Sequence, residues 1–170
     1  KILLLNLKKR KSNKTMSSDY NVESSSFRDN LGNVYNYQNR ILRSINKLGK
    51  SNYEFIKNNN ILESSIKENH LINTFEIKKE DLPEFFSKFE FVLESQIVPY
   101  ISYPYEWTFE QLKRAALHHL DFQIFLFKKE AVLRDASAYN IQFIGAQPIF
   151  IDLLSIKKYK EGEYWSAYKQ

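Results

Sequence analysis

Two short apolar stretches, NVYNY and RILRSI, flank the polar pair QN within residues 33–45. Apolar runs separated by so short a polar link are typical of a β-hairpin. Further on, residues 51–72 open with Ser51 and Glu54 at the spacing of a capping box, in which each side chain bonds the other residue's backbone at the start of a helix. The apolar residues that follow predict one broken helix or two short helices.

β-Branched and aromatic residues dominate residues 90–107, EFVLESQIVPYISYPYEW, which Pro99 and Pro104 interrupt. Such residues favour strands, and the residue before a proline is held extended. This segment therefore predicts one or two strands that end in an extended crossing segment.

The strongest helix signal covers residues 109–127, and Thr108 and Gln111 form a second capping box at its start. Apolar residues then recur as an i+4 series that two further residues widen: Leu112, Ala116, Leu120 and Ile124, with Ala115 and Phe127. An apolar stripe at this period usually faces the core, so we expect this helix to be largely buried.

Three short apolar runs, AVLRD, NIQFIG and QPIFIDLL, follow within residues 131–154, and the GAQ link predicts a tight hairpin between the last two. Asp135 and Asn140 lie in the polar loop between the first two runs, and Asp152 ends the apolar part of the third. We expect these three side chains to converge at strand ends. The alternative is that Asp135 and Asn140 only form the turn, since such side chains often bond their own backbone.

The chain has 170 residues, with 43% apolar and 15% aromatic side chains, which suits one domain or two small lobes around one core. Its formal charge of +5 comes from one end. Six of the 25 basic residues lie in the first fifteen positions without any acidic residue, which leaves 19 basic against 20 acidic side chains in the rest. The rest has no sign of the basic surface that a nucleic-acid backbone requires, so we expect no nucleic-acid partner.

The absence of cysteine excludes disulfides and thiolate chemistry, so His, Asp, Glu and Asn remain as metal ligands. The opening KILLLNL is too short for a signal peptide or a membrane span, and no later stretch reaches eighteen consecutive apolar residues. We therefore expect a soluble, cytoplasmic chain without a membrane partner. The pattern indicates no oligomeric state.

The order of the parts around Asp135, Asn140 and Asp152 suits phosphoryl transfer to a hydroxyl group. That chemistry depends on positioning and charge neutralisation, with one carboxylate facing the proton of the nucleophile. A second carboxylate and an amide oxygen must hold Mg²⁺, which prefers hard oxygen ligands. A helix, a strand, a polar loop and a returning hairpin would bring such groups together.

LRDASAYNIQF, with PIFID after it, resembles the catalytic loop and metal-binding segment of the protein-kinase-like superfamily, particularly its aminoglycoside and small-molecule phosphotransferases. The resemblance implies Asp135 as the catalytic residue, Asn140 and Asp152 as Mg²⁺ ligands, ATP as the cofactor and a small molecule as the substrate. It also implies an α+β fold with the two-lobe architecture of protein kinases.

Three regions follow from this resemblance and from the composition. They are a flexible basic and polar tail at residues 1–25, a β-rich N-lobe with a helix at residues 26–102, and a hinge with a truncated C-lobe at residues 103–170. For the tail, the alternative is that ILLLNL pairs as a strand or packs on a neighbouring element.

A longer resemblance covers most of residues 26–170 and includes FRDNLGNVY and ISYPYEWTFEQLKRAALHHLDFQ. These stretches look like the N-terminal region of bacterial proteins in which a kinase-like segment precedes a class I S-adenosylmethionine-dependent methyltransferase domain. The resemblance implies that domain as a partner in the full-length protein. The sequence has no glycine-rich strand-turn-helix of a methyltransferase, so we do not expect this segment to bind S-adenosylmethionine.

The chain departs from the kinase pattern where phosphates would be held. It has no glycine-rich phosphate loop and offers only Gly32, which is too little to bring several backbone N–H groups onto a triphosphate. Arg43 is the basic residue nearest to the position of the strand lysine, although the geometry of its guanidinium differs, and Glu54 or Glu63 would be its partner on the helix. Arg43 and Glu63 are our candidates for cofactor binding.

Two further departures lie beside the catalytic segments. Leu133 precedes the Arg-Asp pair where kinases carry His, and Leu153 and Leu154 stand where Phe-Gly would follow Asp152. These differences leave a rival hypothesis, in which the chain is a non-catalytic module of the same fold that binds a substrate or partner for the methyltransferase.

Overall fold

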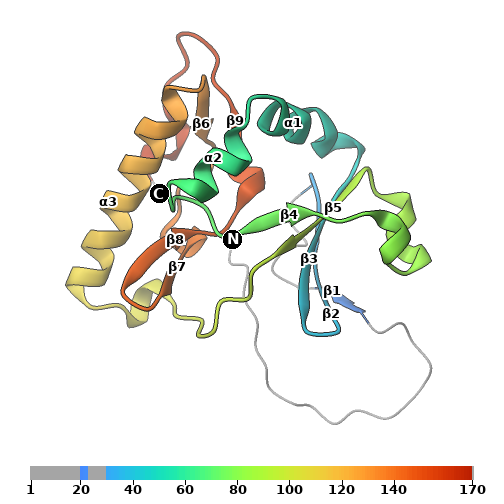
Figure 1. Ribbon diagram of the computed structural model, residues 1–170. Coiled ribbons are helices and arrows are strands. Elements are labelled where there is room, and N and C mark those ends of the chain that lie inside the picture. The colour runs from blue at the N-terminus through green and yellow to red at the C-terminus, as the bar shows by residue number, and fades with distance from the viewer. Residues whose placement is uncertain (1–19, 23–29, 170) are drawn as a thin grey trace.

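The computed structural model describes residues 20–22 and 30–169. It is a mixed α+β structure with three small antiparallel sheets (Figure 1), so the α+β part of the predicted fold class is confirmed. The strands are β1 (Tyr20–Val22), β2 (Val34–Tyr37), β3 (Arg40–Ile45), β4 (Thr74–Glu76), β5 (Phe91–Ser95), β6 (Ala131–Leu133), β7 (Ile141–Ile144), β8 (Gln147–Phe150) and β9 (Ile156–Lys158). The helices are α1 (Lys47–Asn58), α2 (Ile61–Lys67) and α3 (Phe109–Phe127), and short 3-10 turns are η2 (Lys79–Asp81), η3 (Glu84–Lys88), η4 (Pro104–Glu106), η5 (Ala138–Asn140), η6 (Leu153–Ser155) and η7 (Ser166–Lys169).

The largest sheet has the strand order β1-β2-β3-β5-β4, and every neighbouring pair is antiparallel. The predicted hairpin is β2–β3, whose turn residues Gln38 and Asn39 have positive φ of 48° and 61°, as the tight hairpin turns require. β3 is the central strand, with Arg43 opposite Val34 of β2 and Leu93 of β5.

The two faces of the sheet pack against different clusters. Leu42 of β3 packs with Tyr35, Val92 and Phe86, the last of which comes from η3. Ile45 belongs instead to the main core that α1, α2, α3 and the C-terminal hairpins share. Since side chains alternate along a strand, Arg43 points to the same side as Ile45, toward the main core.

The two predicted helices between β3 and β4 are present, and the break between them lies at Asn60, which has a φ of 52°. The predicted capping box at Ser51 and Glu54 is wrong. α1 begins one turn earlier, because the side chain of Asn46 accepts hydrogen bonds from the backbone N–H groups of Leu48 and Gly49 at 2.9 and 3.2 Å.

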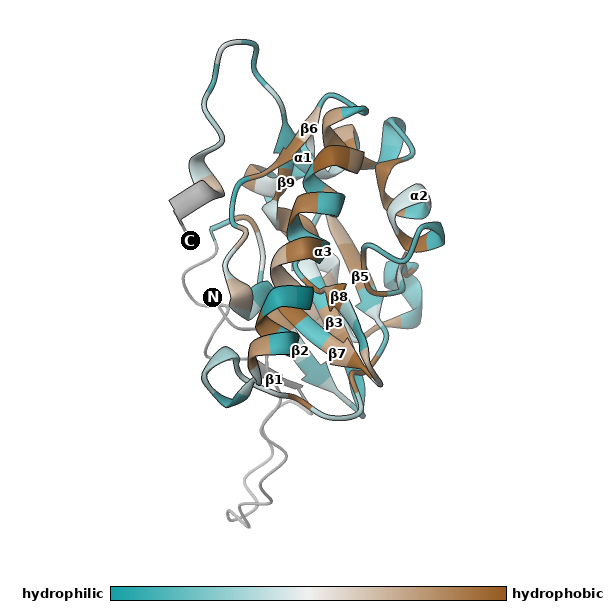
Figure 2. Cartoon of the chain, turned by 90° about the vertical axis from the view of Figure 1, so that its left-hand side faces the viewer, coloured by the Kyte–Doolittle hydropathy of each residue, from teal (hydrophilic) through white to brown (hydrophobic). Residues whose placement is uncertain are grey.

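The capping box of α3 is confirmed, since Gln111 N–H donates to Thr108 Oγ1 at 3.3 Å and Thr108 N–H donates to Gln111 Oε1 at 2.9 Å. The predicted burial of its apolar stripe is wrong except at Ala115, because the other predicted members are exposed. The core takes the other face of the helix, with Ala115, His119, Phe122 and Leu126 buried. The other residues of the stripe face outward. Figure 2 presents this side of the molecule, with α3 in front. A helix with two apolar faces cannot reveal by period alone which face the sheets will cover.

The C-terminal part contains the predicted β7–β8 hairpin, whose turn includes Gly145 at a φ of 60°. β6 pairs with β9, a pairing that brings residues 131–133 beside residues 156–158. A backbone bridge joins this part to the segment after α2, because Phe150 N–H donates to His70 O at 3.0 Å and Ile72 N–H donates to Phe150 O at 2.9 Å.

The predicted tail, residues 1–25, lies mostly outside the described residues, as does the alternative that ILLLNL packs on a neighbour. Within the tail, however, residues 20–22 form β1 and pair with β2. None of the described helices is long and apolar enough to cross a membrane.

Gly32 is required by close packing against β3. A Cβ added there would lie 1.9 Å from the backbone oxygen of Ser44. We expect Gly32→Ala to lower the free energy of unfolding by about 2 kcal/mol, because the central strand would have to shift. Urea denaturation measures this loss. Gly145→Asn is the control, since an added Cβ meets nothing within 4 Å there and Asn tolerates the left-handed conformation; an equal loss in both variants would contradict the packing explanation.

Candidate functional site

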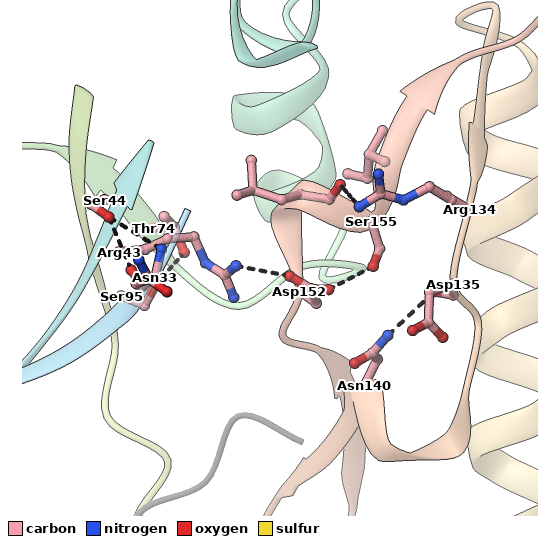
Figure 3. A network of polar contacts seen from close by, with 12 residues as sticks. Asn33, Arg43, Ser44, Thr74, Ser95, Arg134, Asp135, Asn140, Asp152 and Ser155 are labelled. Atoms are coloured by element: carbon pink, nitrogen blue, oxygen red, sulfur yellow. Dashed lines mark hydrogen bonds and ion pairs between the residues drawn. The ribbon is translucent and has the colours of Figure 1, made fainter. Parts of the chain in front are cut away.

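The candidate site is built from β3 and the segments that precede and follow the β7–β8 hairpin. Figure 3 shows Asp152 between Arg43 on one side and the loop with Asp135 and Asn140 on the other. The Asn140 backbone oxygen accepts from Ile151 N–H at 2.9 Å, which keeps the two ends of the hairpin beside each other. The three predicted polar residues are therefore neighbours, although they are up to 17 residues apart in sequence.

Arg43 is a buried cation on the inner face of the central strand, with 5% of its surface exposed. Its Nη1 atom lies 3.0 Å from Asp152 Oδ1, in an ion pair whose side chains are 6% and 16% exposed. The other oxygen of Asp152, Oδ2, accepts a hydrogen bond from Ser155 Oγ at 2.5 Å. Oδ2 is thus hydrogen-bonded, whereas Oδ1, which is buried and has no hydrogen-bond partner among the described residues, faces the guanidinium at ion-pair distance.

Asp135 forms a local turn. Its Oδ1 atom accepts from Ser137 N–H at 2.9 Å, an arrangement in which an Asp side chain bonds the backbone two residues on. The side chain of Asn140 is buried, and its Nδ2 atom donates to the backbone oxygen of Asp135 at 3.3 Å. The turn-forming role that the sequence left open is therefore present, and it holds the carboxylate and the amide on one loop.

The pairing of β6 with β9 fixes this loop against η6. Arg134 N–H donates to Ser155 O at 2.7 Å, and the Arg134 guanidinium donates to Leu154 O at 3.4 Å. Leu153 and Leu154, which stand where kinases carry Phe-Gly, are buried in the main core. Their apolar packing fixes the backbone next to Asp152.

The other predicted cofactor residue, Glu63, is exposed on α2. The carboxylate that pairs with Arg43 is that of Asp152 rather than that of Glu63. Arg43, on strand β3, therefore lies on the opposite side of Asp152 from the loop that carries Asp135 and Asn140.

The donor set suits Mg²⁺ by type, since two carboxylates and an amide offer hard oxygens. The arrangement does not fit a cation as it stands, because the Arg43 guanidinium already faces Asp152 at ion-pair distance. Across the described residues, no group of three or more His, Cys, Asp or Glu side chains could hold a metal ion.

His119 lies under the loop, on the buried face of α3, and its ring packs edge-on against Phe150 at 5.6 Å. Burial, together with a smaller contribution from the neighbouring His118, lowers the pKa of His119 from 6.5 to about 4, while the Asp135 carboxylate opposes the shift. Its Nε2 atom is buried, and in the described part of the chain it has no hydrogen-bond partner. His119 is therefore neutral at pH 7 and forms part of the core.

A separate groove of about 760 Å³ lies between α3 and the β7–β8 hairpin. Arg114, His118 and Asp121 of α3 line it, and His118 Nε2 is 2.9 Å from the backbone oxygen of His70. This groove was not predicted from the sequence. Its only sequence signal is the recurrence of polar residues at helical spacing along α3, which is also typical of a solvated helix face.

In comparisons with known proteins, no protein-family model matches the chain. A curated relative is nodulation protein NoeA of Rhizobium meliloti (strain 1021), which is 39% identical over 145 residues. The chain resembles part of NoeA. The aligned region covers 85% of this chain and 30% of NoeA, so the chain spans less than a third of the length of this relative.

The buried Arg43–Asp152 pair predicts a large cost when one partner is removed. We expect Asp152→Ala to lower the free energy of unfolding by about 3 kcal/mol, because it leaves a buried guanidinium without this carboxylate. The double variant Arg43→Met with Asp152→Ala should recover a large part of that loss.

Urea denaturation of Asp152→Ala, Arg43→Met and the double variant checks this coupling. Glu90→Ala is the matched control, because it removes the carboxylate of the more exposed Lys50–Glu90 pair, whose side chains are 46% and 25% exposed, and should cost less than about 1 kcal/mol. Additive losses for Arg43→Met and Asp152→Ala would show that the two charges do not interact.

The lowered pKa of His119 predicts a stability that falls in acid. In the folded protein, His119 takes up a proton at a pH about 2.5 units lower than in an unfolded chain. The stability that the neutral ring contributes is therefore complete above pH 6.5 and is lost as the pH falls toward 4. Burial also lowers the pKa of His70 and His118, which adds to the loss. Between pH 7.5 and pH 5 we expect His119→Leu to lose about 2 kcal/mol less stability than the wild type in urea denaturation. Equal losses would mean that His119 is not held neutral.

Proposed function

We propose that this chain is a kinase-like, non-catalytic module that binds a substrate or a partner within a longer protein. The observation that carries the proposal is the ion pair of Arg43 with Asp152 at 3.0 Å. In kinases, the corresponding Asp holds the Mg²⁺ that neutralises the phosphates. Here a guanidinium of the protein itself supplies the positive charge at that carboxylate.

The arrangement of elements supports the kinase-like part of the proposal. A five-stranded sheet with helices between β3 and β4 comes first, and an extended segment after β5 leads to a long helix, a polar loop and a hairpin. This is the order of parts that the resemblance to the protein-kinase-like superfamily implies. The segments LRDASAYNIQF and PIFID occupy the loop and the hairpin end in that order.

The surroundings of Gly32 support the non-catalytic part. A phosphate-binding loop presents several backbone N–H groups to the ligand, usually on successive glycines. Gly32 is a single glycine whose missing side chain makes room for the backbone of β3, since an added Cβ would lie 1.9 Å from Ser44 O. Packing alone accounts for this glycine.

The relative suggests the setting in which the module works. NoeA is named as a nodulation protein, and the chain aligns with 30% of its length. We propose a role in a longer, nodulation-related protein, in which a methyltransferase domain is the partner that the sequence resemblance implies. The module would then position a substrate or domain for chemistry that takes place elsewhere.

A second candidate function is phosphoryl transfer from ATP to a small-molecule hydroxyl. The observation that favours it is that Asp135, Asn140 and Asp152 lie together beside one loop (Figure 3). In this reading, Asp135 faces the acceptor, Asn140 and Asp152 take Mg²⁺, and Arg43 moves from Asp152 to the phosphates. The two candidates differ in whether Asp152 accepts a cation while Arg43 is present.

Thermal unfolding with Mg²⁺ and ATP separates the two candidates. We expect no rise in Tm for the wild type in several millimolar MgATP or Mg²⁺ alone, because Arg43 occupies the Asp152 carboxylate. We expect Arg43→Met to be less stable and to recover several degrees with Mg²⁺, because the carboxylate is then open to a hard cation.

The double variant Arg43→Met with Asp152→Ala is the control and should not respond to Mg²⁺. A rise in the Tm of the wild type with MgATP that disappears in Asp152→Ala would overturn the non-catalytic proposal and support phosphoryl transfer.

A further inference from the structure

The outward face of α3 carries a row of apolar side chains that the core does not use. The exposed fraction of its larger side chains is 80% for Phe109, 41% for Leu112, 47% for Leu120, 57% for Ile124 and 55% for Phe127. Ala116 is also exposed. We call this row the α3 outer stripe: Phe109, Leu112, Ala116, Leu120, Ile124 and Phe127. The helix has 19 residues, so the stripe runs along about 28 Å. Contiguous apolar surface of this kind marks an interaction site in most soluble proteins.

The outer stripe reads almost the same in both directions along the helix. Its members are separated by 3, 4, 4, 4 and 3 residues, so the spacing is symmetric about residue 118. Reversing the helix about that position exchanges Phe109 with Phe127, Leu112 with Ile124, and Ala116 with Leu120. A surface that matches its own reverse is what a two-fold interface between identical helices needs, since each residue then meets a similar residue of the other copy.

The charges beside the stripe have the opposite symmetry. Glu110, Lys113, Arg114, Asp121 and Lys128 are exposed charges on α3, and along the helix they follow one another as acid, base, base, acid, base. When the helix is reversed about residue 118, Lys113 lies within two residues of Asp121 of the second copy, and Glu110 lies within two residues of Lys128 of the second copy. An antiparallel pair therefore places acids next to bases, whereas a parallel pair would place like charges opposite one another.

We propose that the α3 outer stripe is the contact surface of an antiparallel, two-fold dimer of this chain. Leu120 and Ala116 lie nearest the axis, and the phenylalanines close the two ends. Helices that pack through i+4 rows cross at an angle, which concentrates the contact near the axis. A contact of one helix per copy is small, so we expect a dissociation constant on the order of 10–100 μM.

Sedimentation equilibrium over that concentration range tests the dimer. We expect Leu120→Glu to weaken the association at least tenfold, because it places a carboxylate next to the axis. Leu48→Glu is the matched control, since Leu48 is 66% exposed on α1, away from the stripe, and should leave the association unchanged. Both leucines are exposed, so both variants should keep the wild-type circular dichroism spectrum.

Charge reversal tests the antiparallel register. We expect Lys113→Glu and Asp121→Lys each to weaken the dimer roughly threefold, because each places like charges across the interface. The double variant restores opposite charges in both symmetric contacts and should return to within about twofold of the wild type.

Three results would overturn the proposal: a monomer at several hundred micromolar, equal effects of Leu120→Glu and Leu48→Glu, or no recovery in the charge-reversed double variant. A monomer would leave the stripe to a different segment of a longer protein. None of these results depends on whether Asp152 accepts a cation.

Discussion

The buried ion pair between Arg43 and Asp152 is the interaction on which the rest of the account depends. It joins the central strand of the large sheet to the end of the C-terminal hairpin, and its two side chains are only 6% and 16% exposed. Neither charge is stable in such a place without a partner. The pair therefore both connects the two parts of the molecule and decides what Asp152 can bind.

The backbone around the pair leaves its members little freedom. β3 is hydrogen-bonded on both sides, so Arg43 must point into the main core. On the other side, Ser155 bonds the second oxygen of Asp152, while the β6–β9 pairing and the turn at Asp135 hold the loop that faces it. In the kinase-like module that we propose, this scaffold presents a carboxylate paired with an internal guanidinium in place of a metal site.

Much of this arrangement could be predicted from the sequence. Local signals gave the β2–β3 and β7–β8 hairpins, the capping box at Thr108 and the convergence of the loop with Asp152, because turn chemistry and capping act between residues close in sequence. The start of α1 at Asn46 was missed although its cap is local, because Ser51 and Glu54 offer a competing capping-box spacing five residues later. The exposed face of α3 was missed because it depends on which surface the sheets cover. The partner of Arg43 was missed for the same reason: it lies 109 positions further along the chain, and no local pattern encodes such a pairing.

The most direct test of the central claim is the NMR signal of the Arg43 guanidinium. We expect slow rotation of this group, with separate Nη signals that persist in saturating Mg²⁺ and collapse to an averaged signal in Asp152→Asn. An averaged signal in the wild type, or one that appears when Mg²⁺ is added, would show that Asp152 is open to cations and would contradict the account.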